Sequence, residues 1–247
     1  MTALLLDAGN TRVKWALADG ASFVRTGAVA HGDTGWADAL APAWGAMEPS
    51  SIWLASVAAS DITAALCAVL DARFPRTPLQ LVRSAAALGG VRSGYADPAR
   101  LGVDRLLALA GANAGGFARA VVVGVGTAAT IDALADGEHR GGLILPSPDA
   151  MQAAVVAGTQ VRPGHAGRVA AFGRSTEDAL ASGAWIALAA AVERSAATLA
   201  RELGSDAAIV LHGGGAPTLA RVLERPAELR ELLVLEGLAA VAREAVG

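Results

Sequence analysis

The sequence lacks the features that mark an exported or membrane-bound protein. Its 247 residues include a single cysteine, Cys67, which lies in an apolar helical pattern and cannot form an internal disulfide. The N-terminus has neither the basic segment nor the cleavage site of a secretory signal. The longest apolar run, Ala184 to Val192, is far shorter than the about 20 residues that span a bilayer. We therefore expect a soluble, cytoplasmic protein with no membrane partner.

Basic and aromatic residues are also scarce. Lys and Arg number 20 against 23 Asp and Glu, which gives a net charge of −3, and no basic stripe is visible. This balance argues against nucleic acid as the main partner. Aromatic residues make up only 4% of a chain that is 53% apolar and rich in alanine and glycine, so we expect a core of closely packed helices.

Two stretches of the chain share one design, an apolar strand that runs into a glycine turn. They are Leu4-Leu5-Leu6-Asp7-Ala8-Gly9-Asn10-Thr11 and Val121-Val122-Val123-Gly124-Val125-Gly126-Thr127-Ala128. The two align without a gap, with Asp7 on Gly124 and Asn10 on Thr127. This repetition predicts a duplicated α/β protein with mixed sheets, halves at 1–115 and 116–247, and a cleft between them.

Hydrophobic patterns and turn residues predict the elements of each half. Strands are expected at 3–7, 12–18, 22–29, 51–57, 79–82, 120–124, 129–134, 140–145 and 207–211. Helices are expected at 36–47, 60–74, 102–114, 149–157, 175–203, 217–224 and 229–245. Residues 84–100 and 158–174 are expected to be irregular.

Three glycine turns follow predicted strands and indicate a nucleotide site. They are Asp7–Thr11, Gly124–Ala128 and His212–Gly215. Backbone N–H groups in such turns bind phosphate oxygens, because glycine allows close approach. No Walker loop or Rossmann fingerprint is present. The four histidines lack metal-ligand spacing, and no Ser/His/Asp triad is identifiable.

Asp7 and Asp104 are the two carboxylates with a possible chemical role. Asp7 ends a strand beside a phosphate turn, which suits either a Mg²⁺ ligand or an Asx-turn residue. Asp104 stands where a helix begins and is either an N-cap or a base that accepts a proton from a substrate hydroxyl. Arg105 is either a fork for a substrate carboxylate or a surface ion-pair partner. Lys14 is either a phosphate contact or a solvated strand residue, and the sequence alone favours the second. Tyr95 and Thr176 fit structural roles on residue type alone.

Three motifs in this order resemble type III pantothenate kinases. They are Asp7-Ala8-Gly9-Asn10-Thr11, Gly102-Val103-Asp104-Arg105 and Gly126-Thr127-Ala128-Ala129-Thr130-Ile131-Asp132, and the resemblance extends over nearly the whole chain. It implies two ribonuclease-H-like halves of the actin-like ATPase type. It also implies ATP-dependent phosphorylation of pantothenate, the first step of coenzyme A biosynthesis. A homodimer is implied too, with the helix after Thr176 as a candidate interface element.

The resemblance assigns roles by position. Mg²⁺ would be bound by Asp7, and a proton would be accepted by Asp104. The residues that would contact ATP are Asp7, Ala8, Gly9, Asn10, Thr11, Arg12, Val13, Lys14 and Thr127. The residues that would contact pantothenate are Tyr95, Gly102, Val103, Asp104, Arg105 and Thr176.

Two positions depart from the family pattern. Many members carry an aspartate where this chain has Gly124. In those members the aspartate binds a monovalent cation, potassium or ammonium. That cation requirement is therefore in doubt here. Ser147 replaces a usual glycine, for which we expect a local backbone change. The alternatives to a pantothenate kinase are a non-catalytic transcriptional accessory factor and another small-molecule kinase or exopolyphosphatase of the superfamily.

Overall fold

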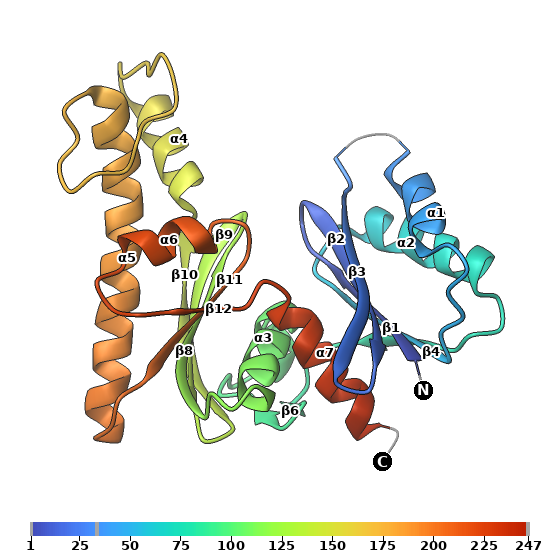
Figure 1. The fold of residues 1–247 in the computed structure, drawn as a ribbon. Coiled ribbons are helices and arrows are strands. Elements are labelled where there is room, and N and C mark those ends of the chain that lie inside the picture. The colour runs from blue at the N-terminus through green and yellow to red at the C-terminus, as the bar shows by residue number, and fades with distance from the viewer. Residues whose placement is uncertain (1, 33–34, 246–247) are drawn as a thin grey trace. The chain divides into compact units, whose positions relative to one another are not determined.

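The computed structural model describes residues 2–32 and 35–245, which form two compact units (Figure 1). The first unit comprises Met1–Gly116 together with Leu232–Gly247, and the second comprises Phe117–Glu231. The sequence placed residues 232–247 in the second half. In the structure the helix within this segment, Leu233–Glu244, packs in the first unit, for the reason given below.

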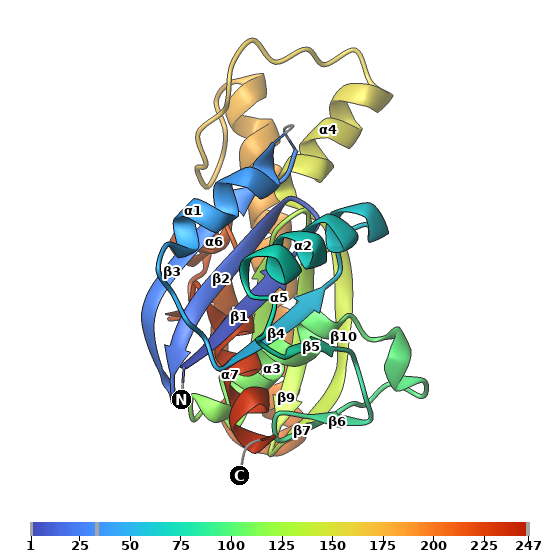
Figure 2. The same cartoon turned by 90° about the vertical axis from the view of Figure 1, so that its right-hand side faces the viewer.

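A mixed sheet with the order β3-β2-β1-β4-β5 forms the centre of the first unit (Figure 2). Its strands are β1 (Thr2–Ala8), β2 (Arg12–Asp19), β3 (Ser22–Ala30), β4 (Ser51–Ser56) and β5 (Leu79–Val82). The first three strands form an antiparallel meander, and β4 and β5 continue the sheet in parallel.

Helices cover both faces of this sheet. Leu4, Leu6 and Trp15 belong to a buried cluster with Trp44 of α1 (Leu40–Trp44) and Leu66 of α2 (Ser60–Arg73). On the other face, α3 (Val103–Ala114) packs against β4, and α7 (Leu233–Glu244) packs against β1, β2 and β4. Both α3 and α7 are almost entirely buried, as expected for helices that are apolar on most sides.

Glycines allow α3 and α7 to pack closely. A Cβ on Gly237 of α7 would collide with the carbonyl oxygen of Leu107, and a Cβ on Gly111 of α3 would collide with that of Leu233. The two backbones are therefore in direct contact, which only glycine permits at these positions. This packing explains why the C-terminal helix belongs to the first unit.

The second unit repeats the topology of the first. Its strands are β8 (Arg119–Val125), β9 (Ala128–Ala135), β10 (Glu138–Pro146), β11 (Ala208–His212) and β12 (Glu228–Leu229). They run in the order β12-β11-β8-β9-β10, with an antiparallel meander β8-β9-β10 and the parallel neighbours β11 and β12. The predicted α/β class with mixed sheets is confirmed, and β1 and β8 occupy equivalent central places.

The long helix α5 (Thr176–Leu203) covers one face of the second sheet (Figure 1). Val121, Val123 and Val125 of β8 join Leu188 and Val192 of this helix in a buried cluster. The other helices of the unit are α4 (Pro148–Gly158) and α6 (Ala216–Val222). Because alternate residues of β8 point to opposite faces, Gly124 lies on the face away from this cluster.

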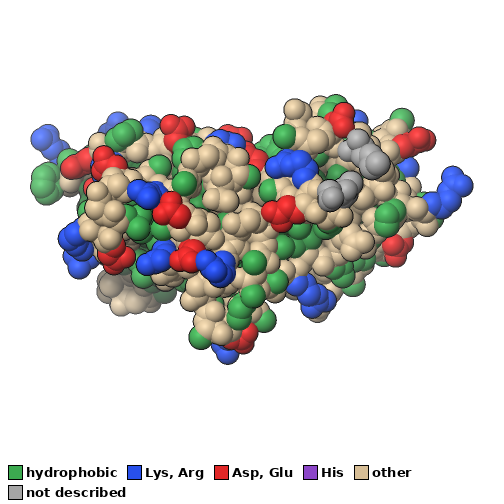
Figure 3. All heavy atoms as spheres, turned by 90° about the horizontal axis from the view of Figure 1, so that it is seen from below, with side chains coloured by type: hydrophobic (Ala, Val, Ile, Leu, Met, Phe, Trp, Pro, Cys, Tyr) green, Lys and Arg blue, Asp and Glu red, His purple; other side chains and the backbone are tan. Residues whose placement is uncertain are grey.

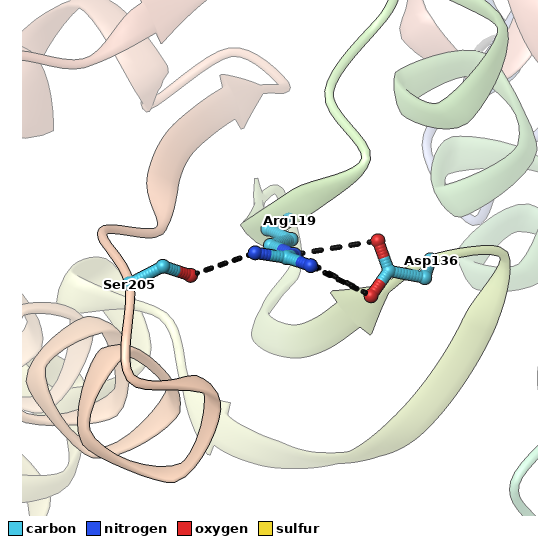
Figure 4. Close-up of polar contacts among 3 residues, drawn as sticks. All are labelled: Arg119, Asp136 and Ser205. Carbon is cyan, nitrogen blue, oxygen red and sulfur yellow. Dashed lines mark hydrogen bonds and ion pairs between the residues drawn. The ribbon is translucent and has the colours of Figure 1, made fainter.

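Arg119, the first residue of β8, connects the β9–β10 turn with the segment that follows α5 (Figure 4). Its guanidinium donates to the Asp136 carboxylate at 3.3 Å and to Ser205 Oγ at 3.0 Å. Asp136 lies in the β9–β10 turn with φ 49°, followed by Gly137 with φ 79°, as expected for the Asp-Gly turn of a hairpin. The side chains of Arg119 and Asp136 are both exposed, so this ion pair contributes at most about 1 kcal/mol.

Several local predictions need adjustment. The helix expected at 36–47 consists of a 3-10 turn, Trp36–Ala39, followed by the short α1. The segment 84–100 contains a small hairpin of β6 (Ala87–Leu88) and β7 (Val91–Arg92). Ser147 caps α4, because its hydroxyl accepts a hydrogen bond from Ala150 N at 3.2 Å. A serine in place of glycine therefore has a local structural purpose.

Surface charge is mixed on the face that Figure 3 shows, where acidic and basic side chains alternate. Among the helices of the described chain, none is both long and apolar enough to cross a membrane.

Candidate active site

Asp7 and Lys14 face each other where β1 and β2 meet the first glycine turn. They are directly opposed in the antiparallel register, so their side chains lie on the same face of the sheet. Both are half-buried. The strand pair thus sets a carboxylate beside an ammonium group at one end of the sheet.

Asp7 also interacts electrostatically with Asp104. The pKa of the Asp7 carboxyl is raised from 3.8 to about 7, mainly by burial and also by the nearby Asp104 carboxylate, while Lys14 opposes the rise. The end of β1 and the first turn of α3 therefore bring two carboxyl groups into one site. Like charges in proximity disfavour ionisation, whereas a bound cation favours it.

In both glycine turns the glycine N–H donates to the first residue of the next strand, although the second turn is one residue shorter than the first. Gly9 N donates to the carbonyl of Arg12, the first residue of β2, at 3.1 Å, and Gly126 N donates to that of Ala128, the first residue of β9, at 3.0 Å. A Cβ on Gly9 or Gly126 would make only ordinary contacts within this chain, at 3.5 and 3.9 Å. The fold itself does not require glycine there, so the bare backbone is available for a ligand.

His31 supports the first turn and was not found from the sequence. Its Nε2 lies 2.8 Å from the carbonyl oxygen of Gly9, and its backbone N donates to Thr11 O at 3.2 Å. Because a carbonyl oxygen only accepts, Nε2 carries the proton. The ring packs edge-on against Trp36, with centroids 5.8 Å apart. No local pattern marks this histidine, because the contact depends on the pairing of β2 with β3.

Asp104 lies inside the first turn of α3 and is not its N-cap. Gly102 is the N-cap residue, with no side-chain cap, and its carbonyl accepts from Arg105 N and Leu106 N, both at 3.1 Å. Asp104 Oδ1 accepts from Arg105 N at 2.9 Å. A Cβ on Gly102 would lie 2.6 Å from Asp104 Oδ1, so glycine here leaves room for the carboxylate.

Arg105 is buried, with 8% of its surface exposed, and is not a surface ion-pair residue. Its Nη1 donates to the Tyr95 hydroxyl at 3.0 Å, and its Cζ lies 5.7 Å from the centre of the Tyr95 ring. A buried guanidinium held in this way presents a planar set of donors suited to a carboxylate.

Two of the predicted site residues, Thr127 and Thr176, lie in the second unit, and the others belong to the first. Thr127 is exposed in the turn between β8 and β9. Thr176 is the exposed first residue of α5, whose cap is Ser175, with an oxygen that accepts from Asp178 N at 3.1 Å. Asp132 of the third motif is buried and pairs with His139 Nε2 at 2.9 Å, which ties β9 to β10.

The donor set at Asp7 fits a divalent cation held jointly with phosphate. In the described parts of the chain, no group of three or more His, Cys, Asp or Glu side chains could hold a metal alone. Mg²⁺ commonly takes one or two protein carboxylates and completes its shell with phosphate and water. Asp7, beside Asp104 and a phosphate-type turn, matches that arrangement.

The chain has the actin-like ATPase and ROK kinase fold. Its marks are the repeated topology and the glycine turn at the end of each central strand. One similar structure is a Campylobacter jejuni protein described as a Baf family transcriptional activator, with TM-score 0.63, 18% identity and 98% of both chains covered. Another is component A of (R)-2-hydroxyglutaryl-CoA dehydratase from Acidaminococcus fermentans, with TM-score 0.57, 12% identity and 100% of both chains covered. At these identities the likeness concerns the fold alone.

Sequence comparison gives the family. The family model for type III pantothenate kinase matches residues 3–198. A type III pantothenate kinase of Xanthomonas campestris is 46% identical over 242 residues, which are 97% of this chain and 96% of the relative. One from Xanthomonas oryzae is 44% identical over the same shares. The chain belongs to the type III pantothenate kinase family.

Proposed function

We propose that this protein transfers the γ-phosphoryl group of ATP to the terminal hydroxyl of pantothenate. Membership of the pantothenate kinase family supports the reaction. The observation that carries the assignment of the site is the proximity of Asp7 and Asp104, which couples the phosphate turn of β1 to the start of α3.

The residues divide the work as follows. Asp104 accepts the proton of the substrate hydroxyl, and the N–H of Arg105 orients its carboxylate. A helix N-terminus favours the ionised form of Asp104 and makes it a weak base. A weak base suffices, because phosphoryl transfer through a loose transition state depends mainly on positioning. The hydroxyl group loses its proton to Asp104 as its oxygen bonds to phosphorus, and ADP leaves.

Asp7, Lys14 and the turn 8–13 hold the phosphates of ATP. Asp7 would hold Mg²⁺, which would supply neutralisation of the charge on the phosphate oxygens. Lys14 supplies a point charge on the same face of the sheet. Thr127 is a further residue proposed to contact ATP, on the basis of the family resemblance.

Arg105 and Tyr95 recognise pantothenate. Pantothenate has one carboxylate, and a buried guanidinium forms charge-assisted, paired hydrogen bonds with such a group. Tyr95 positions Arg105 through the 3.0 Å hydrogen bond. Gly102, Val103 and Thr176 complete the substrate contacts. A homodimer, with α5 as an interface element, is part of the same proposal and is tested by sedimentation analysis of the purified chain.

A coupled assay of ADP release tests the reaction. Release that requires pantothenate, with a product one phosphate heavier by mass spectrometry, is expected. Sugars and polyphosphate serve as competing substrates, and release with one of these but not with pantothenate would assign another activity of the superfamily. DNA binding at physiological salt without ADP release would favour the accessory-factor alternative.

A further inference from the structure

Gly124, His212 and Thr130 lie in one row across the second sheet. Gly124 of β8 is paired with His212 of β11 on one side and with Thr130 of β9 on the other. Directly paired residues point to the same face of a sheet. The middle position of the row therefore has no side chain, while both neighbours do.

The neighbours fill the space above Gly124. A Cβ placed on Gly124 would lie 2.9 Å from His212 Nε2, 3.0 Å from His212 Cε1 and 2.9 Å from Thr130 Oγ1. Real Cβ contacts are essentially never this short, so the imidazole ring leans over the glycine and occupies the place of a side chain there.

The backbone after His212 is fixed against the same strand. Gly215 N donates to Val125 O at 3.0 Å. Gly213 has φ +90° and lies so close to the Val125 backbone that a Cβ would collide with it. The ring of His212 is consequently anchored close to the turn that follows β8.

This arrangement does not fit a potassium or ammonium site of the kind that the family resemblance implies at position 124. Hard cations such as potassium take oxygen ligands, from carboxylates, carbonyls or water, and a carboxylate is the ligand that the resemblance implies at this position. Gly124 supplies no carboxylate, and an imidazole stands where one would project. Over the described residues, no group of three or more His, Cys, Asp or Glu side chains offers a substitute.

We infer that His212 takes the place of a cation-binding carboxylate in this chain, so that the turn after β8 is ordered without a monovalent cation. His212 acts as a positioning residue for the Gly124–Thr127 turn. The consequence for catalysis rests on the proposed function: phosphorylation of pantothenate is independent of potassium and ammonium.

The first experiment compares chlorides of potassium, ammonium, sodium and choline at equal ionic strength. Pantothenate-dependent ADP release is expected to agree within about twofold in all four salts. Stimulation of tenfold or more by potassium or ammonium over choline would overturn the inference. Absence of release in every salt would instead contradict the proposed function.

The second experiment measures binding without catalysis, by the thermal unfolding midpoint in potassium and choline. The wild type, His212→Ala and Gly124→Asp are each expected to unfold at the same temperature in both salts. The double variant Gly124→Asp/His212→Ala has both a carboxylate and space, and we expect potassium to raise its midpoint. A potassium-specific rise in the wild type, or none in the double variant, would show that His212 does not replace the cation site.

Discussion

Asp7 at the end of β1 and Asp104 in the first turn of α3 lie within electrostatic reach of each other, and the charge of Asp104 helps to raise the pKa of Asp7 to about 7. Folding brings these two carboxyl groups together at a cost, because each disfavours ionisation of its neighbour. Such a cost is common where a site is built for a cation and a phosphate.

The raised pKa of Asp7 makes stability depend on pH. Between pH 3.8 and about 7 the folded protein holds a proton on Asp7 that the unfolded chain has lost, so the free energy of unfolding falls as pH rises through this window. We expect Asp7→Asn to be more stable than the wild type at pH 8, by roughly 2–4 kcal/mol, and to lose this advantage near pH 4.

Urea unfolding at the two pH values measures this effect. Asp206→Asn is the matched control, because the Asp206 side chain is 99% exposed and the same change there should have little influence at either pH. Equal stability of Asp7→Asn and wild type at pH 8 would contradict the burial of an ionised Asp7.

Gly102 is expected to leave the space that the Asp104 carboxylate occupies. In Gly102→Ala the new methyl group would lie 2.6 Å from Asp104 Oδ1, so the carboxylate must move. We expect kcat to fall about 10–100-fold, as for a small misplacement of a reacting group. Gly158→Ala is the control, because nothing lies within 4 Å of a Cβ there. Equal kcat values for the two variants would show that Gly102 does not help to position Asp104.

His31 is expected to affect ATP more than pantothenate. His31→Ala removes the donor to Gly9 O, and loss of a hydrogen bond worth about 1 kcal/mol should raise KM for ATP roughly fivefold. His31→Gln retains an N–H donor and should recover part of the loss. Steady-state kinetics with each substrate varied in turn separates the effects, and a change confined to pantothenate would refute this role.

Substitutions of Tyr95 and Arg105 should affect KM for pantothenate more than KM for ATP. Tyr95→Phe removes the 3.0 Å contact to Arg105 Nη1 but keeps the ring beneath the guanidinium. We expect a roughly 3–10-fold rise in KM for pantothenate with little change for ATP. Arg105→Lys, which loses the planar fork, should be worse. Unchanged KM for pantothenate in both variants would place the carboxylate elsewhere.

The packing of α7 in the first unit predicts a large loss of stability on enlarging Gly237. Its Cβ would meet the Leu107 carbonyl oxygen, so Gly237→Ala must push the two helices apart, at a cost of about 2 kcal/mol or more. Gly183→Ala in α5, where no atom lies within 4 Å, should be neutral or stabilising. Thermal unfolding of the two variants is the measurement, and similar midpoints would contradict the close contact of α3 and α7.

The sequence predicts those features that depend on residues close together in the chain. Strands that end in glycine turns, and the repeat that relates Asp7 to Gly124, follow from residue order alone, and the mixed sheets agree. The contacts of His31 with Gly9 and of His212 over Gly124 join segments far apart in the chain, so no local pattern reveals them. The place of α7 depends likewise on two glycines that meet only after folding.

The central claim is that Asp104 accepts the proton of pantothenate beside the Asp7 phosphate turn. Asp104→Asn keeps the size of the side chain and an oxygen that accepts from Arg105 N, so the fold should persist. The most direct measurement is the pantothenate-dependent kcat of this variant, with its far-ultraviolet circular dichroism as the check on folding. We predict a fall of about 10²–10⁴-fold. A folded Asp104→Asn variant with kcat within a few-fold of the wild type would contradict the account.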